Sequence, residues 1–257
     1  IPIDKNFIEH AKNLKFIARV GAGMENIDVE FAHKSGIKLI SSPEGNRDSV
    51  AEHVVGMLLI LMNRLFIAST EVKNGIWKRE ENRGDELLGK TFGIIGYGNM
   101  GKAVAKRLSG FGVSVIFHDI IPNLSDEFAT QTTMETLYRD ADILSLHLPL
   151  SAETHYLIDA EFISKMKKDF YFINTARGKN VKTHDLVKAI KSGKIKGAAL
   201  DVLEYEKASF ENIESGNEDL QYLLHSEKAI LTPHIAGWTV QSKEKLAQVI
   251  VDKILSD

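Results

Sequence analysis

The sequence predicts an α/β protein built on a doubly wound, mostly parallel sheet. Short apolar runs alternate with segments of helical spacing along almost the whole chain. One of these runs passes through a glycine-rich turn directly into a helical segment, and polar residues follow several others. Parallel strands need helical crossovers, so this alternation favours a sheet that is covered by helices.

Length and composition narrow the class of protein further. The 257 residues are 44% hydrophobic, which is enough for one large or two modest domains. A net charge of −3 gives no basic field for nucleic acid. The absence of cysteine excludes disulfides and thiolate chemistry, and the longest apolar run, 54–62, is too short for a membrane span. We therefore expect a cytoplasmic protein that binds neither nucleic acid nor membrane.

The first part of the chain predicts two strands, a short helix and one long helix. The expected strands are residues 15–20, which end in a glycine loop at 21–23, and 37–40, and the short helix is 28–34. Asp48 or Ser49 caps the long helix, which runs to about Asn74 and stops at Gly75. Apolar side chains nearly encircle its middle, so we expect both a domain and a partner to cover it.

The rest of the chain continues the alternation of strands and helices. Strands are expected from residue 91 and at 113–117, 142–146, 170–173, 197–202 and 229–231. Helices are expected at 102–111, 134–139, 161–167, 183–191 (or from 184) and 240–255. The charged segment 78–86 is expected to be a solvated hinge loop, and residues 207–226 to be polar and irregular.

The glycine-rich turn lies in the stretch 91–101 and fits the dinucleotide fingerprint G-x-G-x-x-G. Gly96 allows the tight turn, and Gly98 lets a pyrophosphate approach the backbone. Gly101 lets the following helix pack close to the strand, with the positive end of its dipole facing the phosphates. This pattern predicts a Rossmann unit.

An acidic residue stands at the place where such a unit binds the ribose. Asp119 follows the next predicted strand, 18 residues after Gly101. Its charge would repel a 2′-phosphate, and the following Ile120, Ile121 and Pro122 supply no cation to hold one. The sequence therefore predicts NAD rather than NADP as cofactor. The alternative is an ordinary strand–helix turn with a surface aspartate.

Unusual groups follow three later strands: Arg177, the pair Asp201 and Glu206, and His234. Ligands of open α/β sheets bind at the carboxyl ends of the strands, so these side chains should converge. A guanidinium binds a carboxylate in two hydrogen bonds, and a histidine supported by a carboxylate can protonate a carbonyl oxygen. Glu204 is an alternative to Glu206, but the spacing from Asp201 favours Glu206. The set is what reduction of a 2-oxo acid needs.

The other histidines have less specific settings. His53 lies one turn into a predicted helix and is expected to be structural, and His118 is expected to pack beside the adenine. His147 could line the cofactor pocket without a catalytic role. His10, His33, His155, His184 and His225 lie in polar contexts and are expected to be solvated. No two histidines have the spacing of metal ligands, so no metal site is predicted.

Taken together, these stretches resemble a known family. In family order, the matching segments are 18–23, 45–46 with 49–53, 91–101, 146–150, 174–178, 198–202 and 232–237. They span nearly the whole chain, and the sequence is similar to the D-isomer-specific 2-hydroxyacid dehydrogenases, most of all to members like phosphoglycerate dehydrogenase.

The resemblance implies roles for matching positions. Arg177 would bind the substrate carboxylate and carbonyl, His234 would be the acid/base, and Glu206 would be its carboxylate partner. Cofactor contacts are expected from Gly96, Gly98, Asn99, Met100, Gly101, Asp119, His147, Pro149, Thr154, Thr175, Ala176, Asp201 and Gly237. Substrate contacts are expected from Ala22, Gly23, Asn46 and Arg177.

The resemblance also implies an organisation and an activity. Residues 1–46 and 238–257 would form a smaller, flavodoxin-like substrate domain, N-terminally incomplete, and residues 47–237 the NAD-binding domain. A homodimer through the long helix after Ser49 is expected. The expected reaction is hydride transfer between NAD and a D-2-hydroxy acid, with 3-phosphoglycerate as first choice and reduction of glyoxylate or hydroxypyruvate as second. An NAD(H)-sensing binding protein without significant turnover is the alternative of another class.

Overall fold

The protein is described by a computed structural model that covers residues 2–206 and 217–256. It divides into two compact units. The smaller unit consists of Ile1–Ser49 and Gly237–Asp257, and the larger unit is Val50–Ala236. The chain therefore passes between the units twice, after Ser49 and after Ala236.

The smaller unit is built around a pair of parallel strands, β1 (Phe16–Ala18) and β2 (Lys38–Ile40). It also contains α1 (Lys5–His10), α2 (Val29–Lys34), α10 (Val240–Leu255) and the first turns of α3 (Pro43–Met62). Asp4 and Asp28 cap α1 and α2 by accepting backbone N–H groups. A small apolar core fills the unit, formed by Ile8, Ile17, Ile27, Ala32 and Ile37.

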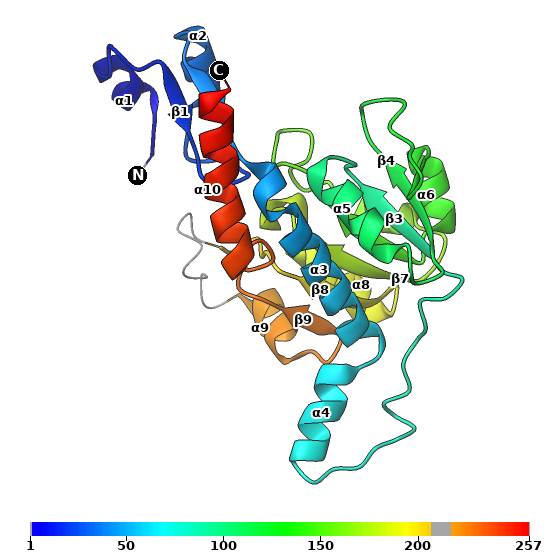
Figure 1. The fold of residues 1–257 in the computed structure, drawn as a ribbon. Helices are drawn as coiled ribbons and strands as arrows, with labels where there is room; N and C mark the ends of the chain where they lie inside the picture. The colour runs from blue at the N-terminus through cyan, green and yellow to red at the C-terminus, as the bar shows by residue number, and fades with distance from the viewer. Residues whose placement is uncertain (1, 207–216, 257) are drawn as a thin grey trace. The chain divides into compact units, whose positions relative to one another are not determined.

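The larger unit contains one seven-stranded sheet in which every pair of neighbouring strands is parallel (Figure 1). The strands are β3 (Thr91–Ile95), β4 (Ser114–His118), β5 (Thr130–Gln131), β6 (Ile143–Leu146), β7 (Phe170–Asn174), β8 (Ile195–Leu200) and β9 (Ala229–Leu231). Their spatial order is β5-β4-β3-β6-β7-β8-β9. The order reverses at β3 and β6, which is where doubly wound sheets bind their ligands.

Helices bury both faces of this sheet, and two separate apolar clusters result. One cluster joins the sheet to α3 and to α5 (Asn99–Leu108). The other joins it to α6 (Met134–Asp140), α7 (Ala160–Lys165), α8 (Thr183–Ser192) and α9 (Glu218–His225). The central strands β6 and β7 read as continuous apolar runs because both of their faces are covered. The predicted α/β fold with a doubly wound parallel sheet is confirmed.

The long helix differs from its prediction at both ends. It begins at Pro43, not at Asp48 or Ser49, since a proline is well suited to the first turn of a helix. It ends at Met62 rather than near Asn74. Arg64 adopts left-handed backbone angles (φ 53°), and a second helix, α4 (Leu65–Lys73), continues in a new direction. The bend between the two helices is 61°.

Three short elements, α1, β5 and α9, were not predicted. α1 is a six-residue helix that precedes the first expected strand. β5 is a two-residue edge strand, too short to produce a periodic signal. α9 lies in the region that was expected to be irregular; Asn217 caps it by accepting the N–H groups of Asp219 and Leu220. The rest of that region, 207–216, lies outside the described residues. α5 begins at Asn99, three residues earlier than expected, because Gly98 is its N-cap.

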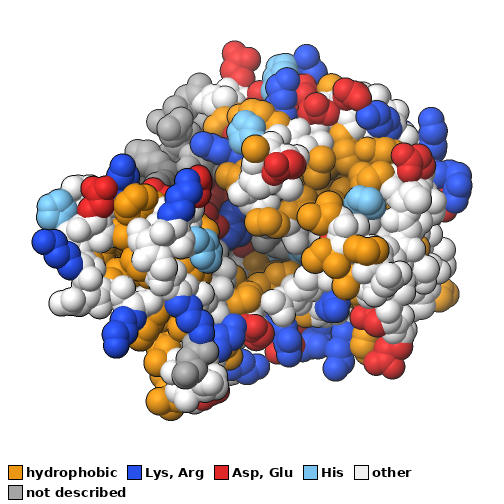
Figure 2. Space-filling view, turned by 90° about the horizontal axis from the view of Figure 1, so that it is seen from above, with side chains coloured by type: hydrophobic (Ala, Val, Ile, Leu, Met, Phe, Trp, Pro, Cys, Tyr) orange, Lys and Arg blue, Asp and Glu red, His pale blue; other side chains and the backbone are white. Residues whose placement is uncertain are grey.

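The surface shows no concentration of one charge in the view of Figure 2. Basic and acidic side chains are interspersed over this face, with hydrophobic side chains gathered between them. Over residues 2–206 and 217–256, no single helix is long and apolar enough to cross a membrane; α3 and α4 meet the length and composition criteria only as a bent pair.

Candidate active site

The glycine fingerprint connects β3 to α5 at the reversal point of the sheet. Gly96 has φ +92°, and a Cβ there would lie 2.5 Å from the carbonyl oxygen of His147. A Cβ on Gly101 would overlap the carbonyl oxygen of Gly96. These two glycines are therefore required by the fold itself.

Gly98 differs from the other two glycines. A Cβ on Gly98 would meet no atom of the described chain within 4 Å. Gly98 is the N-cap residue of α5, and no side chain at this position accepts the first N–H groups of the helix. The unobstructed backbone and the positive end of the helix form a cradle that suits a phosphate group. Thr175 adds a second sign of a ligand, because its buried Oγ1 atom has no hydrogen-bond partner among the described residues. Both observations fit a bound dinucleotide.

Asp119 lies at the end of β4, beside the fingerprint. Its Oδ2 atom accepts the N–H of Tyr97 at 2.6 Å, and its Oδ1 atom accepts the N–H of Ile121 at 2.9 Å. Tyr97 is itself buried and stacks on Phe117 with a centroid separation of 3.7 Å. Each carboxylate oxygen keeps a second lone pair, so Asp119 is held in position and can still accept ribose hydroxyls.

The segment after β6 carries three further predicted cofactor residues. The Oγ1 atom of Thr154 donates to the carbonyl of Pro149 at 2.7 Å and accepts the N–H of Ser151 at 2.8 Å, which closes a compact turn. The Nε2 atom of His147 lies 2.9 Å from Oγ of the buried Ser145. Burial lowers the pKa of His147 to about 3, so its imidazole is neutral near pH 7.

Arg177 follows β7 in a loop that the fold holds tightly. Asn174 is buried, accepts the N–H of Ala176 at 3.0 Å and donates to the carbonyl of Arg177 at 2.9 Å. Gly178 comes next, and a Cβ there would overlap the carbonyl group of Leu203. The loop with Arg177 is therefore packed directly against the backbone of the segment that carries Glu204 and Glu206.

The two glutamates of that segment have different partners. Glu204 accepts the hydroxyl of Tyr156 at 2.5 Å and the N–H of Thr183, at the start of α8, at 2.9 Å. Glu206 accepts the N–H of Leu203 with one oxygen, and its other oxygen, Oε2, lies 2.8 Å from Nδ1 of His234. The geometry therefore distinguishes the two carboxylates: Glu204 links its segment to Tyr156 and α8, and Glu206 pairs with His234.

His234 follows β9 and has an unusual backbone. Its φ of +55° lies in the left-handed region, which costs free energy for a residue other than glycine. Its N–H donates to the carbonyl of Asp201 at 2.8 Å. A carboxylate only accepts hydrogen bonds, so Nδ1 of His234 carries the proton shared with Glu206. Proton exchange with a substrate would then take place at Nε2.

Asp201 directly follows β8 and was expected to contact the cofactor. The structure shows that its carboxylate is 1% exposed and accepts hydrogen bonds from the loop that carries His234. A cofactor contact at this position stays a prediction. The sequence did not identify Thr232, whose hydroxyl donates to Asp201, as a site residue; only its place two residues before His234 could have suggested it.

Asn99 and Met100 form the first turn of α5 in the larger unit, whereas the predicted residues Ala22, Gly23, Asn46 and Gly237 belong to the smaller unit. The loop with Ala22 and Gly23 is fixed at Gly21, whose carbonyl accepts the N–H of Ser42 and whose N–H donates to Oγ of Ser42. Arg19 also donates to the carbonyl of Gly23. Within the same unit, a Cβ on Gly237 would lie 2.5 Å from the amide nitrogen of Asn46. Oδ1 of Asn46 is buried and has no partner among the described residues, which suits a residue that meets a ligand.

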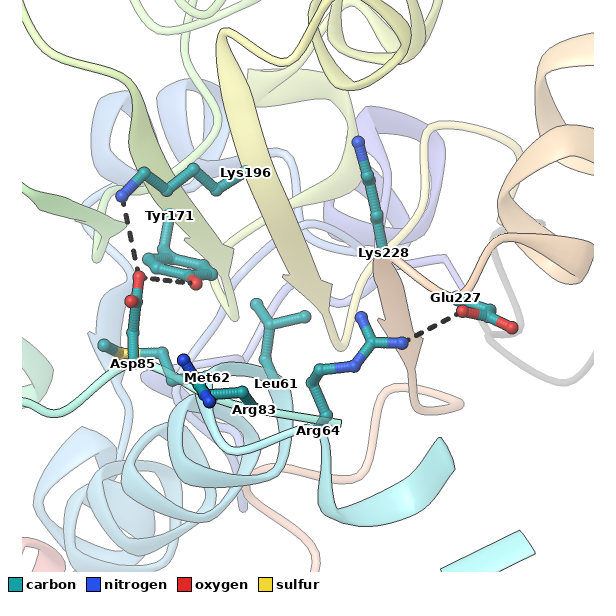
Figure 3. A pocket seen from close by; sticks show the side chains of 10 residues that line it. Leu61, Met62, Arg64, Arg83, Asp85, Tyr171, Lys196, Glu227 and Lys228 are labelled. Carbon is teal, nitrogen blue, oxygen red and sulfur yellow. Dashed lines mark hydrogen bonds and ion pairs between the residues drawn. The ribbon is translucent and has the colours of Figure 1, made fainter. Parts of the chain in front are cut away.

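A pocket of about 170 Å³ lies elsewhere in the larger unit, at the amino ends of β7 and β8 (Figure 3). Several of its charged groups pair with other residues of the lining. Arg64 reaches Glu227 at 3.1 Å, and Asp85 accepts the hydroxyl of Tyr171 at 3.0 Å and lies 3.5 Å from Lys196. Ligands of such sheets bind at the opposite, carboxyl ends of the strands, so we assign this pocket no part in the site.

Comparison with known proteins decides the family. The profile of the D-isomer specific 2-hydroxyacid dehydrogenase, NAD binding domain, matches residues 55–236. The chain belongs to this family. The resemblance seen in the sequence is thereby confirmed, and this 2-hydroxyacid dehydrogenase is an enzyme that uses NAD as cofactor.

Its relatives act on several acids. The dehydrogenase is 36% identical to the hydroxypyruvate reductase of Thermotoga maritima, covering 99% of this chain and 81% of that protein. It is 39% identical to the glyoxylate reductase of Thermofilum pendens, covering 99% and 75%. It is 37% identical to the D-3-phosphoglycerate dehydrogenase of Archaeoglobus fulgidus, covering 99% of this chain but 47% of that protein.

A solved structure shares the fold closely. The D-lactate dehydrogenase of Aquifex aeolicus, complexed with NAD and lactic acid, superposes with a TM-score of 0.85 at 33% identity. The match covers 99% of this chain and 80% of that structure. The chain is therefore an NAD-dependent 2-hydroxyacid dehydrogenase.

Proposed function

We propose that this dehydrogenase reduces a small 2-oxo acid, glyoxylate or hydroxypyruvate, with His234, Glu206 and Arg177 as its catalytic residues. The observation that carries the proposal is the 2.8 Å contact between His234 and Glu206 at the carboxyl ends of adjacent strands, beside the loop of Arg177. The same residues would catalyse the reverse oxidation.

Each residue has a distinct task in this proposal. Arg177 binds the substrate carboxylate in two parallel hydrogen bonds and stabilises negative charge that develops on the carbonyl oxygen. His234 donates a proton from Nε2 to that oxygen. Glu206 accepts a hydrogen bond from the Nδ1–H group, holds the ring in one tautomer and stabilises the imidazolium form. Bound NADH supplies the hydride that the carbonyl carbon takes up.

The cofactor would be held by the larger unit. The backbone at Gly98 and the first turn of α5 would bind the pyrophosphate, and Asp119 would accept the ribose hydroxyls. Thr175 would supply its buried hydroxyl near the nicotinamide half.

Two observations favour a small acid over the phosphorylated substrate that was expected first. Relatives matched over three quarters or more of their length include a hydroxypyruvate reductase and two glyoxylate reductases. In the predicted substrate loop, the cation Arg19 is engaged by Gly23 and by Glu25, at 2.8 Å from the latter. The similarity to a D-3-phosphoglycerate dehydrogenase keeps 3-phosphoglycerate as the second candidate.

The test is NADH oxidation with glyoxylate, hydroxypyruvate, phosphohydroxypyruvate and pyruvate. The expected result is turnover on glyoxylate or hydroxypyruvate that is lost in His234→Ala and retained in His225→Ala, a control histidine on the exposed side of α9. Turnover restricted to phosphohydroxypyruvate would instead support the second candidate. Full activity of His234→Ala would contradict the proposed acid/base.

We also propose that the enzyme is a homodimer in which a second copy covers α4. No residue of α4 is buried. The exposed fraction is 66% for Phe66 in this helix and 82% for Trp77 in the following loop. Apolar surface of this kind is typical of protein interfaces. Light scattering should give the dimer mass for the wild type and the monomer mass for Phe66→Asp combined with Trp77→Asp. A monomeric wild type at all concentrations would contradict the proposal.

A further inference from the structure

A buried carboxylate organises the loop between β9 and the end of the larger unit. The Oδ1 atom of Asp201 accepts the hydroxyl of Thr232 at 2.6 Å and the N–H of Ile235 at 2.8 Å. Its Oδ2 atom accepts the N–H of Ala236 at 2.8 Å. Three donors therefore stabilise an aspartate that is almost fully withdrawn from solvent.

Thr232 has a second partner from a distant part of the chain. The Nε2 atom of His53, in α3, lies 3.0 Å from Thr232 Oγ1 across a separation of 179 residues. The single hydroxyl proton of Thr232 is given to Asp201, whose carboxylate can only accept. His53 must therefore donate, and its proton is on Nε2. The order of donation is His53 to Thr232 to Asp201.

The relay of His53, Thr232 and Asp201 acts on the backbone around His234. His234 lies between Thr232 and the two N–H groups that Asp201 holds, and its own N–H donates to the carbonyl of Asp201 at 2.8 Å. Its left-handed backbone persists only where the surroundings enforce it. Releasing the Thr232 end of the loop would therefore let the imidazole move relative to Glu206.

We propose that His53 is a positioning residue, which through Thr232 and Asp201 fixes the loop that carries His234 in its active conformation. This inference rests on the proposed acid/base role of His234. It assigns a function to a histidine for which the sequence predicts only a structural role. His53 lies four residues after the first passage between the units, and the loop ends at the second.

Two matched pairs of variants test the relay. Thr232→Val removes the hydroxyl at nearly constant volume, and Thr232→Ser keeps it. His53→Leu removes the donor, and His53→Gln keeps an N–H that can reach Thr232. We expect Thr232→Val and His53→Leu to lower kcat about tenfold or more, because a displaced catalytic group costs rate directly. Thr232→Ser and His53→Gln should retain most of the wild-type rate, with the affinity for NADH, measured by fluorescence, changed less than about twofold.

The outcomes separate positioning from general damage. Wild-type kcat in both Thr232→Val and His53→Leu would overturn the proposal, and so would an equal loss in Thr232→Ser and His53→Gln. A parallel loss of kcat and NADH binding, with a lowered melting temperature, would also overturn it, since that is the result of a purely structural role.

A readout without turnover distinguishes this inference from the proposed function. The ¹⁵N–¹H spectra of the histidine rings should show His53 as the Nε2–H tautomer in the wild type, and Thr232→Val should change that signal. The Nδ1–H tautomer would overturn the relay even if His234→Ala is inactive. Conversely, an active His234→Ala with the Nε2–H tautomer at His53 would refute the acid/base assignment alone.

Discussion

The imidazole of His234 and the carboxylate of Glu206 meet at 2.8 Å although 28 residues separate them in the chain. The other oxygen of Glu206 accepts the N–H of Leu203, three residues earlier in the chain. This local hydrogen bond fixes the carboxylate in the position where it contacts the histidine. The pair joins the loops after β8 and β9, which are neighbours in the sheet. Parallel strands deliver both loops to the same edge, and this explains why such distant residues form one contact.

Replacing Glu206 by Gln should separate charge from hydrogen bonding. The amide can occupy the same place but cannot stabilise an imidazolium, so we expect the kcat for reduction of the oxo acid to fall about 10²-fold with a smaller change in KM. Steady-state kinetics at saturating NADH measures both. Glu227→Gln is the control, because Glu227 is exposed and pairs with Arg64 away from the site. A kcat equal to that of the wild type would refute the role of Glu206.

Gly98→Ala should weaken cofactor binding without destabilising the fold. The new methyl group would meet no atom of the described chain but would stand in the phosphate cradle. We expect the Kd of NADH to rise about tenfold or more, at an unchanged melting temperature. Gly110→Ala is the matched control. A Cβ on Gly110 would also meet no atom within 4 Å, and Gly110 lies just beyond the C-terminal end of α5, away from the cradle. Equal NADH affinities in the two variants would count against the cradle.

Gly178→Ala should damage both stability and rate. A Cβ at this position would overlap the carbonyl group of Leu203, so the loop with Arg177 and the segment with Glu206 must move apart. We expect a loss of about 1–3 kcal/mol in the free energy of unfolding by urea, together with a lower kcat. Gly56→Ala, inside α3 with open space around it, should instead be neutral or stabilising by up to about 1 kcal/mol. The reverse order of stabilities would contradict the close packing of Gly178 on Leu203.

Acidification should destabilise the enzyme in part through His147. Burial lowers the pKa of His147 from 6.5 to about 3, so above pH 6.5 the folded and unfolded states both hold a neutral ring. Between pH 6.5 and about 3 the unfolded chain binds a proton that the folded chain does not. The free energy of unfolding then falls with decreasing pH, by at most about 1.4 kcal/mol per pH unit from this residue.

Urea unfolding at pH 7 and pH 5 measures this effect. His147→Asn should lose less stability between the two pH values than the wild type does, whereas His225→Asn, at an exposed position, should follow the wild type. Identical pH dependence in His147→Asn and the wild type would show that the ring is protonated as easily in the folded state as in the unfolded one.

Local patterns were enough to predict most strands and helices, and they failed where local signals were weak or ambiguous. The apolar runs at β3, β6 and β7 are strands because both faces of the sheet are buried, and a continuous apolar run records that directly. The long helix was misjudged because helical spacing continues across Arg64, where only the backbone angles reveal a break. α9 was missed because its polar surroundings concealed a single apolar face.

The candidate site shows the same division. Sequence alone indicated Arg177, Glu206 and His234, since each follows a predicted strand, and it named the family that the comparisons confirmed. The sequence could favour Glu206 over Glu204 as the carboxylate partner of His234 only by its spacing from Asp201. It gave no reason to expect a hydrogen bond between His53 and Thr232. The partners of these residues come from distant segments of the chain, such as Tyr156 in a turn after β6 and Thr183 at the start of α8 for Glu204.

The sequence by itself determined the fold class, the cofactor and the reaction family, because periodicity, glycine placement and chemically specific residues are local properties of the chain. Only the tertiary structure decided which carboxylate meets His234, which glycine is left open for a ligand, and which distant histidine holds Thr232. Those facts depend on distances of about 3 Å between segments far apart in sequence, and such distances exist only after the strands have been placed side by side.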